Sequence, residues 1–170
     1  MSEPRAPSKA ELLALLRSSG DEVVRIVRAQ TPERLETGRY ENGWNGRQIL
    51  AHLASIEWTY PRLIDIARSA APPEAAPAAA EPPTRQMRGG NDAYNDRQVA
   101  KRANASVDDL LAEFQQNRAA TIKAVEATDE ELLARRIRSA GGVVGPLALV
   151  FSLVAVAHVL GHARDIEGSS

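Results

Sequence analysis

The sequence predicts an all-α protein, a four-helix bundle with a long crossover loop between helices two and three. Apolar residues make up 44% of the 170 positions, and aromatic residues only 4%, a composition rich in helix formers. Most of the expected helices are amphipathic, with apolar residues at helical spacing, and the last one carries almost no charge. The length suits one core, so we expect a single domain over residues 1–170.

The first helix is expected over residues 9–30. Ser8 and Glu11 have the spacing of a capping box, in which each side chain accepts a hydrogen bond from the other's backbone amide. A short helical turn follows over residues 31–35, where Pro32 suits a first helical position. The buried stripe of the first helix is predicted to comprise Leu12, Leu15, Leu16, Val23, Ile26 and Val27.

The second helix is expected over residues 45–68, with Asn45 as its N-cap and Gln48 three residues later. His52 lies three residues after Ile49 and four before Ile56, both apolar. It therefore shares the inward face of the helix. The apolar seam of this helix is predicted to comprise Ile49, Leu53, Ile56 and Tyr60.

Residues 69–90 form an Ala/Pro-rich segment that we expect to be a flexible loop. Its prolines prevent a continuous helix, and it offers little bulky apolar surface to bury. A short polar helix is expected next, over residues 91–102. These segments together make the long connection between the two halves of the bundle.

The third helix is expected over residues 106–127, capped by Ser106. Thr128 and Glu131 have the spacing of another capping box. The fourth helix is expected to begin at Gly145-Pro146 and to end near Glu167, where Gly168 stops it.

The overall charge argues against several classes of protein. The formal net charge is −1 and the pI is about 6.3, so the basic excess typical of nucleic-acid binding is absent. The chain has no cysteine, which excludes a disulfide framework and a thiolate ligand or nucleophile of its own. Residues 1–10 lack an apolar stretch, so we expect no signal peptide and a cytoplasmic protein.

Residues 139–163 contain no Asp, Glu, Lys or Arg, a length that is able to span a bilayer. The same stretch contains glycines, a proline and two histidines, and the other helices are amphipathic. We therefore favour a buried central helix of a bundle over a membrane span.

The three histidines of the chain are the residues best suited to chemistry. His158 and His162 are four residues apart, so both rings project from one face of the last helix. If this helix is a neighbour of the second one, His52 meets them inside the bundle. Three imidazole ligands suit zinc, nickel, cobalt, iron or copper and leave a coordination position open. Buried packing or capping is the alternative role for the histidines.

Two motifs carry a resemblance to a known family. Residues 43–54, GWNGRQILAHLA, resemble the second-helix signature of the DinB-like superfamily, and residues 158–166, HVLGHARDI, resemble its final-helix motif. The resemblance implies a bundle of unusual connectivity with His52, His158 and His162 as metal ligands. It also implies homodimers, and metal-dependent transferases or isomerases that use a low-molecular-weight thiol such as mycothiol or bacillithiol. Relatives of the maleylpyruvate isomerase type commonly carry an extra C-terminal domain that this sequence does not match.

Other polar residues near these motifs are candidates for supporting roles. Glu57 and Asp165 are candidates to orient a histidine or to act as a catalytic base, with a solvated helix face as the alternative. Arg47 is a candidate for cofactor binding. It would form a cationic rim together with Arg135, Arg136 and Arg138, although a charge run is more commonly only a hydrated surface. Trp44 is expected to pack at the helix start rather than line a pocket. Three further candidates for the pocket mouth are Asn91, Tyr94 and Asn95, although capping and loop anchoring are more common roles for such residues.

Three functions follow from this reading. The leading one is an enzyme whose divalent metal, zinc or nickel, activates an external thiol for attack on a small electrophile. The second is a metal-dependent hydrolase of a small electrophile or toxin. The third is a non-catalytic bundle whose metal site is closed by Glu57 or Asp165.

Overall fold

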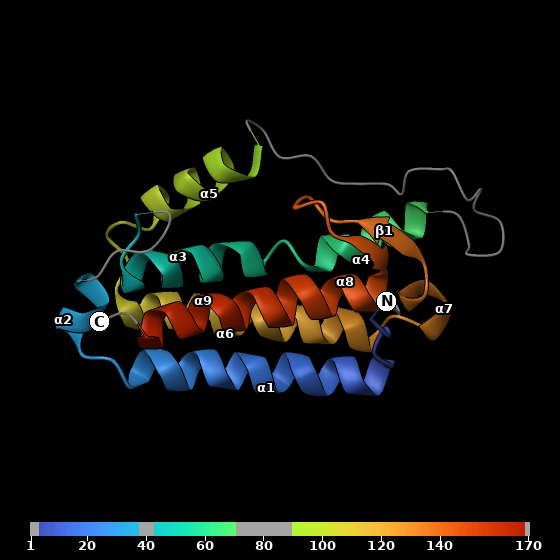
Figure 1. The fold of residues 1–170 in the computed structure, drawn as a ribbon, viewed down its shortest axis with the longest axis horizontal. Helices are drawn as coiled ribbons and strands as arrows, with labels where there is room; N and C mark the ends of the chain where they lie inside the picture. Colours follow the sequence, from blue (N-terminus) through green and yellow to red (C-terminus); the bar gives the residue numbers. More distant parts are fainter. Residues whose placement is uncertain (1–3, 38–42, 71–89, 169–170) are drawn as a thin grey trace.

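In the computed structural model, residues 4–37, 43–70 and 90–168 are described, and their main helices pack into an elongated bundle (Figure 1). The expected all-α four-helix bundle is confirmed. Its main helices are α1 (Lys9–Arg28), α3 (Gly46–Glu57), α6 (Val107–Glu126) and a C-terminal segment made of α8 (Leu147–Phe151), η1 (Ser152–Ala157) and α9 (His158–Gly168).

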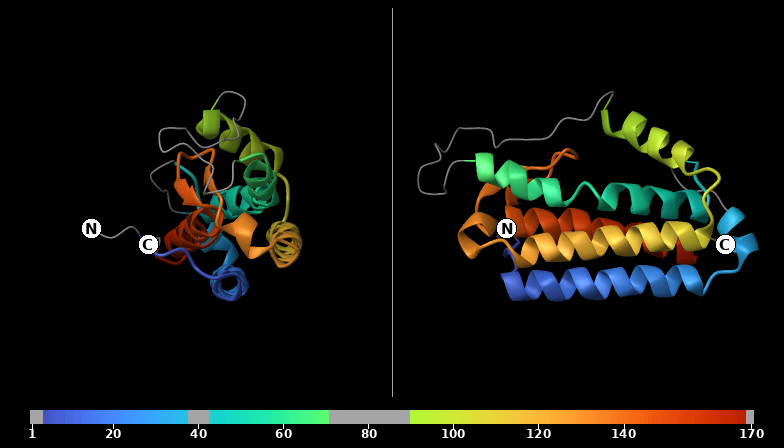
Figure 2. Two further views of the ribbon diagram at one scale, coloured as in Figure 1. Left: turned by 90° about the vertical axis from the view of Figure 1, so that its right-hand side faces the viewer. Right: turned by 180° about the vertical axis from the view of Figure 1, so that it is seen from behind.

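The helices run in two parallel pairs rather than alternating in direction. α3 and α6 run the same way, and α1 and the C-terminal segment run the opposite way (Figures 1 and 2). Because α3 and α6 run in the same direction, the chain that connects them must return along the bundle. α5 (Gly90–Lys101), which packs on α3, is part of this connection. This is the predicted crossover. Residues 71–89 of the Ala/Pro-rich segment lie outside the described residues.

Side-chain caps begin three of the main helices, α1, α3 and α6, as expected. Ser8 and Glu11 form a complete capping box on α1, and Asn45 and Gln48 form one on α3. Ser106 accepts a hydrogen bond from the amide of Asp109 at the start of α6. The short helix α2 (Pro32–Glu36) begins at Thr31.

The predicted Thr128 capping box is wrong. The hydroxyl of Thr128 donates instead to the carbonyl of Ala124, 2.8 Å away, within the last turn of α6. The side chain of Asp129 caps the following helix α7 (Glu130–Leu133) by accepting from the amide of Leu132 at 2.7 Å. A carboxylate one residue later thus takes the capping role, which suits the positive end of the helix dipole.

The predicted second helix is divided into α3 and α4 (Pro61–Ser69). Pro61 has no backbone N–H to donate and its ring crowds the preceding turn, so the helix ends at Glu57 and restarts at the proline. A tight turn over residues 58–60 joins the two helices, with the amide of Thr59 donating to Ile56 at 2.9 Å.

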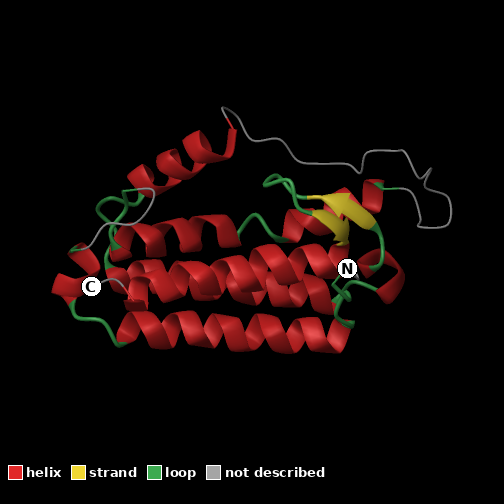
Figure 3. Cartoon of the chain, in the orientation of Figure 1, coloured by secondary structure: helices red, strands yellow, loops and turns green. Residues whose placement is uncertain are grey.

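A β-hairpin that the sequence analysis did not predict precedes the last helix (Figure 3). β1 (Arg136–Arg138) pairs antiparallel with β2 (Val144–Pro146), and Ile137 lies opposite Gly145. Gly142 makes the turn with φ = 86°, a value that favours glycine. The strands are too short for a periodic signal.

The C-terminal segment lies inside the bundle, packed against α1 and α3. In the described part of the chain, Leu147–Gly168 is the one helix long and apolar enough to cross a membrane, and half of its apolar window is buried within the protein. We predicted one continuous α-helix here. The middle of the segment, η1, is instead a π-helix, and this difference affects the histidines that follow it.

Candidate metal centre

The three histidines meet at one point between α3 and α9. His52 lies in the middle of α3, His158 is the first residue of α9, and His162 lies one turn further on. One ring nitrogen from each lies within 4.8 Å of the other two. The ring centroids of His158 and His162 are 4.5 Å apart, and that of His52 is 4.9 Å from His162. The convergence expected from the sequence is confirmed.

This cluster fits a transition-metal ion. Metal–imidazole bonds of about 2.0–2.1 Å in a tetrahedral site require nitrogens roughly 3.3 Å apart, which small side-chain rotations achieve from this arrangement. Nδ1 of His52 is buried without a hydrogen-bond partner among the described residues. A buried imidazole nitrogen with no partner is costly, and a metal ion or a protonated neighbour is what normally compensates it.

The environment keeps all three rings neutral at physiological pH. Burial lowers the pKa of His52 to about 3, assisted by the nearby His162 and His158. Loss of hydration near the surrounding protein atoms also lowers the pKa of His162 to about 4 and lowers the pKa of His158, although part of the His158 side chain reaches the surface. Neutral imidazole is the form that binds metals, so protons do not compete for these nitrogens near pH 7.

A cavity of about 660 Å³ opens beside the histidine cluster. His52 and His158 line it, and His158 is exposed, whereas His52 is buried. The other walls come from α3, α4, η1 and the tip of the β-hairpin, and Asn95 of α5 reaches it as the sequence analysis suggested. A ligand in this cavity would therefore have direct access to the cluster.

Trp44 forms part of the wall behind His52. The two ring centroids are 5.1 Å apart with an angle of 43° between the planes, and Trp44 also packs against the core. The expected packing role is thus combined with direct contact to a member of the cluster. The indole restricts the rotation of the His52 ring.

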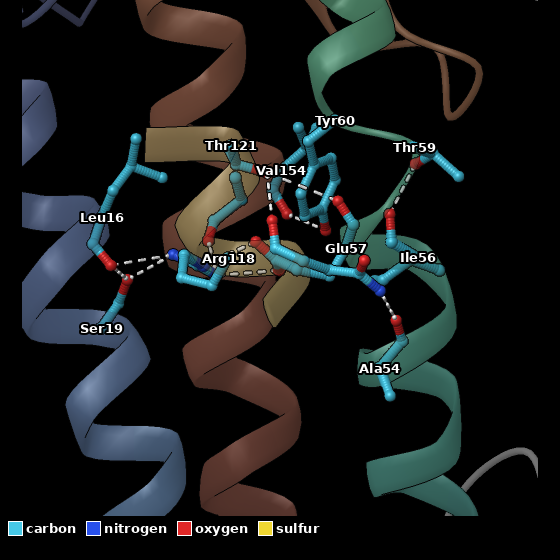
Figure 4. A network of polar contacts seen from close by, with 12 residues as sticks. Leu16, Ser19, Ala54, Ile56, Glu57, Thr59, Tyr60, Arg118, Thr121 and Val154 are labelled. Carbon is cyan, nitrogen blue, oxygen red and sulfur yellow. Dashed lines mark hydrogen bonds and ion pairs between the residues drawn. The ribbon is translucent and has the colours of Figure 1, made fainter. Parts of the chain in front are cut away.

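The carboxylate of Glu57 pairs with Arg118. Arg118 Nε lies 2.6 Å from Glu57 Oε1, and Arg118 Nη2 donates to Glu57 Oε2 at 3.0 Å (Figure 4). Burial raises the pKa of the Glu57 carboxyl, and the neighbouring guanidinium acts in the opposite direction. With this partner, Glu57 is engaged in the bundle interior rather than at the ring nitrogens.

Asp165 lies on the histidine side of α9. Its Oδ2 is 3.9 Å from Nδ1 of His162, and its side chain is about half exposed. The distance is too long for a hydrogen bond, but the carboxylate raises the pKa of His162 against the effect of burial. Asp165 therefore interacts with His162 electrostatically.

Two of the four arginines expected to form a cationic rim, Arg47 and Arg135, are used elsewhere. Arg47 Nη2 donates to the carbonyls of Arg102 and Ala103, at 3.0 and 2.8 Å, and to that of Ala105, so it binds the loop before α6. Arg135 Nη1 donates to the carbonyl of Ala70 at 3.1 Å, just after α4. Both guanidinium groups support loops and helix ends in this structure.

Arg118 is the polar residue that the sequence analysis missed. It is 4% exposed and contacts α1, α3 and η1 from its position on α6. The sequence did contain a signal, because Arg118 occupies a position in the buried stripe of its helix. A charged residue at such a position predicts a buried ion pair. The other buried members of this stripe are Leu110, Leu111, Phe114, Thr121 and Val125.

Comparison with known proteins agrees with this fold. The profile of the family described as "Mycothiol maleylpyruvate isomerase N-terminal domain" matches residues 17–167. No curated protein sequence matches the chain significantly.

Two solved structures share the fold. The mycothiol-dependent maleylpyruvate isomerase superposes with a TM-score of 0.73 at 18% identity, over 99% of this chain and 64% of that chain. YfiT from Bacillus subtilis, titled a "probable metal-dependent hydrolase with an unusual four-helix bundle topology", superposes with a TM-score of 0.68 at 19% identity, over 97% of this chain and 89% of that chain.

This chain therefore spans slightly less than two thirds of the isomerase and most of YfiT. At identities of 18% and 19%, the two structures show only that the fold is shared. Family membership rests on the profile match. The protein belongs to the mycothiol maleylpyruvate isomerase N-terminal domain family, within the DinB-like superfamily.

Proposed function

We propose that this protein is a metal-dependent enzyme that transfers a low-molecular-weight thiol to a small electrophile. The observation that carries the proposal is the convergence of three neutral histidines at the wall of a cavity large enough for a small molecule. His52, His158 and His162 would hold one divalent transition metal, zinc or nickel, and leave a coordination position facing the cavity.

A metal ion held by these residues would supply Lewis acidity, which lowers the pKa of a thiol or water ligand near neutral pH. Residues of the chain would hold and orient the metal. The neutral rings offer their nitrogens without prior loss of a proton, and Trp44 limits the rotation of His52. Asp165 would hold the orientation of His162 through its charge. The chain has no cysteine, so the sulfur must come from a separate thiol such as mycothiol or bacillithiol.

The cavity lining supports an apolar, uncharged electrophile. Arg62 is the one permanently charged side chain among the described residues that line it, and its guanidinium lies 4.0 Å from the ring centroid of Trp58. A carboxylate buried here would have one positively charged side chain available to pair with, so a neutral ligand is less costly to bury. Six of the sixteen lining residues have large aliphatic side chains: Ile56, Leu63, Ile66, Val143, Leu153 and Val154.

Hydrolysis is the second candidate, because this chain covers 89% of YfiT, the structure titled a hydrolase, but only 64% of the isomerase. In that case water takes the place of the thiol at the same site. Glu57 was a candidate base for such a step, and its pairing with Arg118 leaves Asp165 as the carboxylate nearer to the histidines.

A thiol-dependence assay separates the two. The metal-loaded protein is incubated with a neutral aromatic electrophile, with and without mycothiol, bacillithiol or cysteine, and a carboxylated analogue of the electrophile serves as the charge control. We expect turnover only with a thiol, a preference for the neutral electrophile, and loss of activity in His52→Ala. Turnover in the absence of any thiol would contradict thiol transfer and favour hydrolysis as the function.

The family resemblance also leads us to propose a cytoplasmic homodimer that acts on a small molecule. Analytical ultracentrifugation at micromolar concentration tests the dimer, for which we expect twice the 18.4 kDa chain mass. A species of single-chain mass across the concentration range would contradict it.

A further inference from the structure

The π-helix η1 changes which face of the C-terminal segment points into the bundle. All five residues of α8 are buried, and the three with no exposed surface are Leu147, Val150 and Phe151. The buried residues after η1 are Val159, Ala163 and Ile166. On an uninterrupted α-helix, with 100° per residue, these two buried groups would point about 130° apart. A π segment absorbs one extra residue, which reduces the difference to about 30°. The π-helix therefore aligns the two halves of the segment.

The same rotation determines where the metal-site histidines point. His158 immediately follows η1, and its backbone amide donates to the carbonyl of Leu153, five residues earlier. In an α-helix that amide would donate to Val154. Without the π segment, His158 and His162 would therefore be turned by about 100° relative to α3 and His52. The register of η1 is thus a condition for the three-histidine cluster.

Tyr60, on the turn between α3 and α4, and Arg118, on α6, bind carbonyls of the π segment. The hydroxyl of Tyr60 donates to the carbonyl of Val154 at 2.7 Å, and Arg118 Nη2 donates to the carbonyl of Ala155 at 2.8 Å (Figure 4). Burial raises the pKa of Tyr60, so its hydroxyl keeps the proton that it donates. Buried carbonyls need such donors, and an α-helical rearrangement of the segment would forfeit both bonds.

Arg118 is itself fixed in position. Glu57, at the end of α3, faces the guanidinium, and Arg118 Nη1 donates to Leu16 O at 3.1 Å and to Ser19 Oγ at 2.9 Å on α1. The donor to Ala155 therefore has one well-defined location between four helices (Figure 4). Tyr60 lies on the turn after α3, the helix that carries His52. The network thus links the positions of all three histidines.

We propose that Tyr60 and Arg118, the latter held by Glu57, are positioning residues for the metal centre. They fix the π register of η1 and so direct His158 and His162 toward His52. This inference rests on the proposed metal site, but it concerns the folding of the chain around that site and not the reaction.

Cobalt(II) binding to Tyr60→Phe tests the inference, with affinity from titration and site geometry from the visible absorption spectrum. The substitution removes one hydroxyl and leaves the ring. We expect an affinity about tenfold weaker than that of the wild type, the scale for residues that orient ligands, and an altered spectrum. Arg118→Lys, which keeps the charge but loses the forked donor geometry, should act in the same direction.

The matched control is Thr128→Val, which removes another buried hydroxyl bonded to a carbonyl, that of Ala124, at the end of α6 outside the network. We expect it to lower thermal stability while the cobalt affinity and spectrum stay those of the wild type. Wild-type affinity and spectrum in Tyr60→Phe and Arg118→Lys would overturn the positioning role and leave the metal site standing. A wild type that binds no cobalt would instead overturn the proposed function.

Discussion

Glu57 and Arg118 form an ion pair inside the bundle, with 2.6 Å between Glu57 Oε1 and Arg118 Nε, and neither side chain is more than 4% exposed. The pair stands between the helices that carry the three histidines. Glu57, which the sequence suggested as a catalytic carboxylate, is therefore paired with Arg118. Removal of one charge of such a buried pair strongly destabilises the fold, whereas replacement of both charges by apolar side chains is often neutral or stabilising.

Arg118→Met should lower the free energy of unfolding by about 3–5 kcal/mol, because it leaves the Glu57 carboxylate buried without its partner. The double variant Glu57→Leu/Arg118→Met should recover most of this loss, since no charge remains buried. Urea unfolding followed by circular dichroism measures both. If the double variant is as unstable as the single one, the pair is not the source of the effect.

Removal of the metal should leave the protein folded. The core is continuous through all the main helices and includes no cluster side chain other than buried His52, so the ion is not needed to form it. We expect the far-ultraviolet circular dichroism spectrum to remain helical after treatment with a chelator, and the melting temperature to fall by the amount that lost binding energy accounts for. Unfolding on chelation would instead identify the ion as structural.

The stability of the metal-free protein should decrease in mild acid. The pKa of His52 is about 3 and that of His162 about 4 in the folded protein, against about 6.5 in the unfolded chain. The unfolded chain therefore takes up protons below pH 6.5 that the folded protein does not. The stabilising contribution is complete above pH 6.5 and is lost as the pH falls toward 4, by about 1.4 kcal/mol per pH unit for buried His52.

Urea unfolding at pH 7, 6 and 5 in the presence of a chelator measures this slope. His52→Gln removes one of the titrating groups and should reduce the slope without changing its sign. Equal stability at the three pH values would show that the histidines are not held neutral by the fold.

Arg47→Ala should destabilise the protein without changing metal affinity. Arg47 donates to the carbonyls of three residues before α6, and its side chain is 13% exposed, so its loss leaves part-buried acceptors without a donor. We expect a cost of about 1–3 kcal/mol in the free energy of unfolding. Arg17→Ala, which removes an exposed ion pair with Glu126, is the control and should cost little. A change in metal affinity in Arg47→Ala would return this residue to a role in cofactor binding.

Local sequence patterns predicted most of the fold. Capping residues such as Ser8 and Asn45 determine where helices begin, and the spacing of apolar residues determines which face is buried, so both are visible in a single sequence. The four-residue spacing of His158 and His162 likewise placed two members of the cluster on one face. The apolar neighbours of His52 placed the third on the inward side of its helix.

The remaining features depend on contacts between distant segments. The π register of η1 is stabilised by Tyr60 and Arg118, which lie 94 and 37 residues away from the carbonyls that they bind, and no local pattern reports such bonds. The β-hairpin is too short for alternation to be detected. The orientation of the Glu57 side chain also depends on a distant residue, Arg118. The sequence shows only that Glu57 lies five residues after His52, so it does not reveal this partner.

Metal stoichiometry tests the central claim most directly. Elemental analysis of the untagged protein is compared with His52→Ala, His158→Ala and His162→Ala, each checked for folding by circular dichroism. We predict about one zinc or nickel ion per chain in the wild type and a loss of most of it in each variant, because three ligands share one ion. A wild type that takes up neither added metal, or three variants that all retain one ion per chain, would contradict the three-histidine centre.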